Sequence, residues 1–177
     1  MTPKVQYFIE DHIWEIDHNL FAALYQVLIE DENFSGYDIS EFTQALYAAG
    51  IDPVLYMDQI PPAFMFGNTR LKKVDIEEGT ISIMYSAYQY CADIEEIILP
   101  QSMDEIEWDA FIGCTRIKRI VIKNPNITID DSAFEEMTID EIEFNGTRQE
   151  FENLSLRIYA EIVRCHDGDI KTLTSKI

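Results

Sequence analysis

Apolar residues recur every 23 positions through the middle of this 177-residue chain. Seven such columns stay in phase over three successive units: Leu71, Ile94, Ile117; Val74, Ile97, Ile120; Ile76, Leu99, Ile122; Ile83, Ile106, Ile129; Ala87, Ala110, Ala133; Tyr88, Phe111, Phe134; and Cys91, Cys114, Met137. A unit of roughly 20–50 residues cannot bury its apolar side alone, so successive units must stack. The pattern therefore predicts a short solenoid of 23-residue rungs with parallel, in-register strands.

Each predicted rung has the same internal order. It opens with a short strand of the form apolar-x-x-apolar-x-apolar, and a turn follows. A second extended segment is centred on Ile83, Ile106 or Ile129, and a turn or short helix then carries the alanine–aromatic pair. Glycine and proline disfavour continuous strand and lie where the turns are expected. These residues are Gly79, Pro100, Pro125 and Gly146.

The array has imperfect units at both ends. Residues 67–71, Gly-Asn-Thr-Arg-Leu, match residues 113–117, Gly-Cys-Thr-Arg-Ile, at a separation of 46, which is twice the period. They indicate a degenerate first rung. A fourth opening strand starts one residue early at Ile139, keeps Ile142 and Phe144, and then diverges.

Charged pairs in the opening strands support the same register. They alternate in sign from rung to rung: Lys72-Lys73, Glu95-Glu96, Lys118-Arg119 and Asp140-Glu141. Equivalent positions in a parallel stack lie about 4.8 Å apart, so each column becomes a ladder of opposite charges. A shifted pairing would bring like charges together, so the ladders are expected to fix the register.

The N-terminal part of the chain, residues 1–62, carries no repeat and reads as helical. Apolar residues between Ile13 and Ile29 follow helical spacing, and a second helix is expected from about Asp38 or Ser40 to Gly50. The sequence thus predicts three parts: an N-terminal helical cap over residues 1–62, a solenoid over 63–145, and a closing segment over 146–177.

The rungs resemble a known repeat. Residues 94–100 read Ile-Glu-Glu-Ile-Ile-Leu-Pro, Ile106 follows, and residues 109–115 read Asp-Ala-Phe-Ile-Gly-Cys-Thr. This is similar to the leucine-rich repeat of the BspA type, whose unit is L-x-x-I-x-I-P, an isoleucine after the turn, and A-F-x-x-C. The resemblance covers about residues 64–145 and implies an α+β repeat fold, a leucine-rich-repeat solenoid.

Two further segments extend the resemblance. Residues 144–151 look like the closing F-N-G-T-x-x-x-W segment of such proteins, and residues 163–168 look like their V-x-C-x-D-G end. Residues 49–53, Ala-Gly-Ile-Asp-Pro, resemble the lead-in of short repeat proteins found in phages and prophages. The family implies non-catalytic protein–protein binding or surface adhesion, and this lead-in implies a phage or prophage as the source.

Composition narrows the choice of partner. The formal net charge is −20, and such a field repels nucleic-acid phosphates and anionic lipid while it attracts a basic protein surface. No secretory signal and no apolar run long enough for a membrane helix is visible, so a cytoplasmic protein is expected. The three cysteines form no Cys-x-x-Cys pair, and Cys91 and Cys114 are expected to be stacked, buried thiols.

Candidate chemistry is sparse. No phosphate-binding glycine loop and no H-E-x-x-H motif occurs, and the spacing of His12 and His18 does not place them on one helix face. Cys165-His166-Asp167 contains the residue types of a nucleophile, base and acid, but such triads converge from separate elements. We therefore expect no enzymatic activity, no metal and no cofactor.

The leading hypothesis is a protein-binding module that uses the sheet of opening strands. Ile98 and Val121 are apolar where exposure is expected, and charged residues flank them, as in a small interface core. The candidate binding residues are Asp75, Glu95, Glu96, Ile98, Arg119, Val121, Glu141 and Glu143. One alternative is an acidic inhibitor or nucleic-acid mimic that blocks a basic DNA-binding or defence protein of the host. Another is a structural or assembly component.

Overall fold

The structure is a computed structural model that describes residues 41, 59–60, 62–135, 137–154 and 156–171. The predicted N-terminal helical cap falls almost wholly outside the described residues. Within that region, Glu41 is helical and residues 59–60 form a strand. The helical cap therefore stays a prediction.

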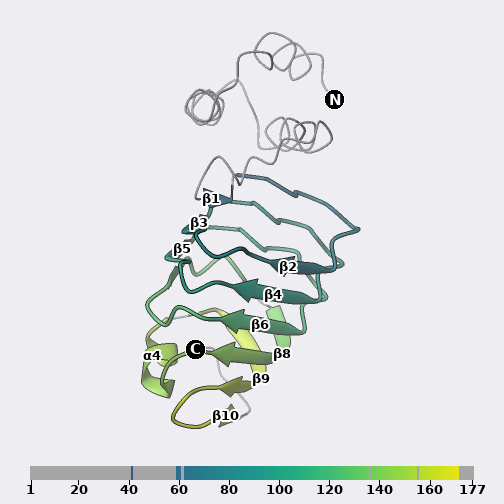
Figure 1. The fold of residues 1–177 in the computed structure, drawn as a ribbon. Coiled ribbons are helices and arrows are strands. Elements are labelled where there is room, and N and C mark those ends of the chain that lie inside the picture. Colours follow the sequence, from purple (N-terminus) through teal and green to yellow (C-terminus); the bar gives the residue numbers. More distant parts are fainter. Residues whose placement is uncertain (1–40, 42–58, 61, 136, 155, 172–177) are drawn as a thin grey trace.

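The described residues form a solenoid in which two sheets face each other across the core (Figure 1). The small sheet has the order β1-β3-β5-β7. Its short strands are β1 Gln59–Ile60, β3 Ser82–Ile83, β5 Glu105–Ile106 and β7 Thr128–Ile129. The large sheet has the order β10-β9-β8-β6-β4-β2. Its strands are β2 Lys73–Asp75, β4 Glu96–Leu99, β6 Arg119–Ile122, β8 Met137–Phe144, β9 Ile158–Arg164 and β10 Ile170–Lys171.

The pairing confirms the repeat register predicted from the sequence. In the large sheet Val74 lies opposite Ile97, which lies opposite Ile120, and in the small sheet Ile83 lies opposite Ile106. The next strand falls one position short of the period, as predicted, because Ile120 lies opposite Ile142. Among the described strands, all pairs except β9–β10 are parallel.

The apolar columns fill the space between the sheets. Tyr88 stacks on Phe111 with ring centroids 5.1 Å apart, and Phe111 stacks on Phe134 at 4.9 Å. The thiols of Cys91 and Cys114 are buried and donate to backbone carbonyls, and burial raises their pKa values to about 11 and about 12. Because each column member touches its equivalents above and below, the core is continuous along the stack.

At the C-terminal end of the stack, a helix and two further strands follow the last rung. Helix α4, Arg148–Asn153, begins with a capping box in which Thr147 and Glu150 exchange hydrogen bonds. Its Phe151 packs on Phe144 at 5.4 Å between ring centroids, which brings the chain back under the core. β9 then adds one more parallel strand, and the short β10 pairs with β9 in the opposite direction.

A left-handed backbone position recurs in the turn that precedes each of three opening strands. Gly67, Tyr90 and Gly113 occupy equivalent positions of successive rungs and have φ values of 68°, 60° and 78°. Glycine adopts this conformation without strain, whereas other residues are strained there. At Gly113 space matters as well, because an added Cβ would lie 2.3 Å from Cδ1 of the Tyr90 ring.

We expect Gly113→Ala to lower the free energy of unfolding more than Gly79→Ala does. Both glycines have positive φ, but nothing lies within 4 Å of a Cβ at Gly79. Gly79→Ala should therefore cost about 1–2 kcal/mol of conformational strain, and Gly113→Ala should add the cost of displacing the Tyr90 ring. Urea unfolding followed by circular dichroism measures both. In a Tyr90→Ala background the two costs should become similar; an unchanged difference there would contradict this account.

Candidate functional site

The candidate site is the outer face of the large sheet, where alternate strand residues point away from the core. Two rows of side chains cross the strands there, and strand pairing places them in register. The first row consists of Lys73, Glu96, Arg119 and Glu141. The second row consists of Asp75, Ile98, Val121, Glu143 and Arg164. These rows hold all the predicted binding residues except Glu95, which lies just before β4.

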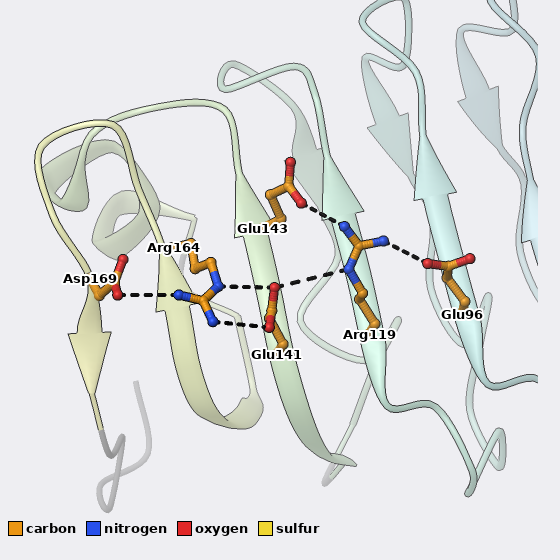
Figure 2. A network of polar contacts seen from close by, with 6 residues as sticks. All are labelled: Glu96, Arg119, Glu141, Glu143, Arg164 and Asp169. Atoms are coloured by element: carbon orange, nitrogen blue, oxygen red, sulfur yellow. Dashed lines mark hydrogen bonds and ion pairs between the residues drawn. The ribbon is translucent and has the colours of Figure 1, made fainter.

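Ion pairs join the first row into a continuous ladder. Glu96 pairs with Lys73 at 3.2 Å and with Arg119 at 2.6 Å. Arg119 also reaches Glu143 at 2.6 Å, and its Nε lies 4.0 Å from Glu141. Figure 2 shows how Arg119 bridges three carboxylates on the strands to either side. The predicted alternation of charge is therefore realised as direct contacts.

The ladder continues past the last predicted rung. Arg164 on β9 pairs with Glu141 at 3.1 Å and with Asp169 at 3.4 Å (Figure 2). Hydrogen bonds from Arg119 and Lys73 hold the pKa of Glu96 below its usual range, and bonding to Glu141 raises the pKa of Arg164.

The neighbouring column is only partly a ladder. Glu95 lies 2.8 Å from Lys118 and 3.9 Å from Lys72, as predicted. The predicted contact between Lys118 and Asp140 is wrong: no ion pair joins them in the part of the chain that the structure describes. The reason is that the single Lys118 ammonium group lies against Glu95, on the opposite side from Asp140.

Ile98 and Val121 lie side by side at the centre of the second row. Ile98 is partly exposed, but Val121 is only 8% exposed, so the expectation of an exposed valine is wrong. Glu143 is the register partner of Val121, and Arg119 lies two positions before Val121 on the same strand. The Arg119–Glu143 ion pair therefore runs diagonally past Val121 and shields it from solvent.

An open hollow of about 490 Å³ lies at the C-terminal ends of β6, β8 and β9. Val121, Ile122 and Phe144 give it an apolar part. The remaining lining residues are Gln101, Lys123, Glu143, Asn145, Arg164, Cys165 and His166. The hollow therefore continues the second row of the face beyond Val121.

Hydrogen bonds fix the polar rim of the hollow. Asn145 Nδ2 donates to the carbonyl oxygen of Lys123 at 2.9 Å, so Asn145 Oδ1 is the atom that lies 2.8 Å from His166 Nε2. His166 Nε2 must then donate, because a carbonyl oxygen can only accept. This hydrogen bond fixes the orientation of the imidazole against the rim.

The tripeptide 165–167 forms no catalytic arrangement. Asp167 Oδ1 accepts from the backbone N–H of Arg148 at 2.8 Å, and His166 bonds to Asn145 instead of to a thiol. Burial raises the pKa of Cys165, which disfavours the thiolate. Among the described residues there is also no group of three or more His, Cys, Asp or Glu side chains that could hold a metal ion.

The family comparison agrees with this geometry. The model of the BspA type leucine-rich repeat region matches residues 59–158, more than half of the chain, in six copies. The chain belongs to this family. BspA-type repeats generally serve protein interaction, so the chain carries an interaction module. The comparison with curated proteins found no match, and the comparison with solved structures found none either.

Sequence reasoning missed the part of this BspA-type face that the closing segment supplies. Arg164 joins both the ladder and the hollow, and Lys123, Asn145 and His166 form the rim. The alternation in residues 158–164 was a signal for another strand. Its offset from β8 is shorter than the repeat period, however, because Glu143 lies opposite Arg164, so the period does not reveal it.

In the described part of the chain, no helix is long and apolar enough to cross a membrane.

The ladder predicts how stability depends on pH. The folded-state pKa of Glu96 is depressed, so its contribution is present above the unfolded pKa of about 4.3 and is lost as pH falls through the folded value. We expect Glu96→Gln to lower the free energy of unfolding by about 0.2–1 kcal/mol at pH 7 and by less in acid. Urea unfolding at a series of pH values measures the difference.

The matched control is Glu161→Gln on β9. Glu161 is exposed, and within the described residues its carboxylate makes no ion pair, so this change should leave the free energy of unfolding nearly unaltered at every pH. Added salt should shrink the effect of Glu96→Gln at pH 7. A Glu96→Gln effect of constant size from pH 7 to pH 3 would show that the ion pairs are not its cause.

Proposed function

We propose that the outer face of the large sheet binds a segment of another protein, with the partly exposed Ile98 and the hollow that Val121 lines as the apolar part of the contact. The observation that carries this proposal is an apolar pair inside a rim of fixed charges, beside an open hollow, on a repeat whose family serves protein interaction. Interfaces commonly combine an apolar centre with a polar rim.

The ion pairs favour binding because they fix the charged side chains around the apolar centre before a partner docks. Arg119 touches three carboxylates, so little side-chain freedom remains to be lost when a partner docks. The strands of this face are already paired on both sides through β4, β6, β8 and β9. A partner therefore has to contact side chains, because the backbone of these strands offers no free edge.

Charge should affect the rate at which a partner associates more than the strength with which it stays bound. The net charge of −20 favours a protein with a basic surface, because long-range attraction speeds encounter. At the face itself, acids and bases are nearly balanced: Asp75, Glu96, Glu141 and Glu143 lie beside Lys73, Arg119 and Arg164. Short-range binding there should therefore depend mainly on shape and apolar contact.

The other expectations stay predictions. An acidic inhibitor or nucleic-acid mimic would bind a basic host protein mainly through charge, so its capture should fall steeply between low and moderate salt. An assembly component would instead capture copies of itself. A phage or prophage origin and a cytoplasmic location belong with these predictions.

We expect Ile98→Lys to abolish capture of a partner that survives high salt. Ile98 is partly exposed, so a lysine there places a charge in the apolar centre without entering the core. Val121 is buried, and Val121→Thr is the gentler change there, with an expected loss of roughly tenfold in affinity. Affinity capture from bacterial lysate with nuclease, at low and high salt, followed by mass spectrometry, makes the comparison.

Ile81→Lys is the matched control, because Ile81 is also a partly exposed isoleucine but lies just before β3, away from the large sheet. It should leave high-salt capture intact, and circular dichroism should show that all three variants fold. Capture that persists in Ile98→Lys would exclude this face as the binding surface.

A further inference from the structure

An exposed tryptophan lies immediately beyond the small sheet, on a surface that the proposed binding face does not include. Trp108 follows β5 and is 49% exposed, and with Tyr90 it is one of two large apolar side chains that are exposed in the described part of the chain. About half of the Trp108 surface therefore remains in contact with solvent. Tryptophan is among the residues most enriched at interaction hot spots.

The Trp108 ring is held in position from one side. It stacks on Tyr85 of the preceding rung with ring centroids 4.7 Å apart and an angle of 3° between the planes. The same column continues one period later with Asp131, so the aromatic stack stops at Trp108. Asp131 is exposed and its carboxylate pairs with Arg157 at 2.9 Å. Trp108 is thus an oriented aromatic surface with a carboxylate on the next rung.

Charge in the repeat is segregated around this ring. Residues 77–92, 101–115 and 124–135, which lie between the opening strands, contain no lysine, arginine or histidine. Their acidic residues are Glu77, Glu78, Asp104, Glu105, Glu107, Asp109, Asp130, Asp131 and Glu135. The bases of the repeat are instead concentrated in the opening strands, where they form the ladder. Arg157 of the closing segment pairs with Asp131 and Glu135, and the other seven acids make no ion pair in the part of the chain that the structure describes. These segments therefore carry a net negative charge.

One of these carboxylates lies directly beside the aromatic pair. Glu107 Oε2 accepts a hydrogen bond from the backbone N–H of Tyr85 at 3.0 Å. The Glu107 side chain is half-buried, and desolvation raises its pKa. A cation placed on the Trp108 ring would relieve this cost, because it would favour the ionised carboxylate.

We propose that the Tyr85–Trp108 pair anchors a second protein contact, in which an arginine of a basic partner segment stacks on the Trp108 ring. A guanidinium group is planar and weakly hydrated, so it can lie flat on an indole while its N–H groups reach carboxylates at the edge. Here the carboxylate at the edge is that of Glu107 on the same rung, because Asp131 on the next rung already pairs with Arg157. A lysine ammonium group fits this arrangement less well, because it cannot stack.

The test uses the full chain with Trp14→Phe, so that Trp108 is its sole tryptophan. The probe is an end-capped Gly-Ser peptide with spaced arginines, and matched peptides carry lysine or glutamate instead. We expect the arginine peptide to change Trp108 fluorescence saturably, the lysine peptide to bind more weakly, and the glutamate peptide not to bind. Raising the salt to about 300 mM should weaken binding, since charge contributes to it.

Variants of the otherwise unaltered chain locate the contact. With a labelled arginine peptide and anisotropy detection, Trp108→Ala should reduce affinity about 2- to 30-fold, and Trp108→Phe should retain part of it. Tyr90→Ala is the matched control, because Tyr90 is 53% exposed but packs on Phe66, and it should bind the peptide normally. Equal affinity in Trp108→Ala, or no preference for arginine over lysine, would overturn the proposal.

The two proposed surfaces can fail separately. Ile98→Lys should leave arginine-peptide binding unchanged, because Ile98 lies on the large sheet. Loss of peptide binding in Ile98→Lys, with circular dichroism unchanged, would place the peptide on the large sheet and would overturn the assignment to Trp108.

Discussion

Backbone hydrogen bonds between equivalent positions of successive rungs are the constraint on which this structure depends. The N–H of Glu95 donates to the carbonyl of Lys72 at 2.7 Å, and that of Lys118 donates to Glu95 at 2.9 Å. After the one-residue offset of β8, the N–H of Glu141, the register partner of Arg119, donates to the carbonyl of Lys118 at 2.9 Å. Each bond fixes the height and the rotation of one rung on the next. Once that offset is set, every side chain must lie above its equivalent, so the core columns, the thiols and the charge ladders all follow from it.

The same constraint explains why the two sides of the array differ. A residue type that recurs once per rung forms a row along the stack, so the same charge or shape is repeated along that surface. Alternating charge in the opening strands therefore gives a cross-linked, nearly neutral surface, as Arg119 shows. Acidic residues without basic equivalents give an acidic surface on the side that carries Trp108. One repeat thus presents two chemically distinct sides.

The sequence sufficed for the features that obey the period. Ile83, Ile106 and Ile129 identified the short strands, and the step to Ile139 correctly predicted an early fourth strand. What it could not supply was geometry outside the period. Arg164 lies opposite Glu143 of β8 at an offset shorter than the period, so its entry into the ladder depends on how α4 returns the chain. The low exposure of Val121 follows from a diagonal ion pair that spacing alone does not show.

The alternation of charge has a longer period than the backbone. The backbone repeats with every rung, but the sign of the ladder returns only after two rungs. Duplicating a single internal rung would stack lysine on lysine or glutamate on glutamate, whereas duplicating a pair of rungs would keep the sign alternation of the ladder. The smallest unit by which this array can be lengthened without a like-charge contact in the ladder is therefore a pair of rungs.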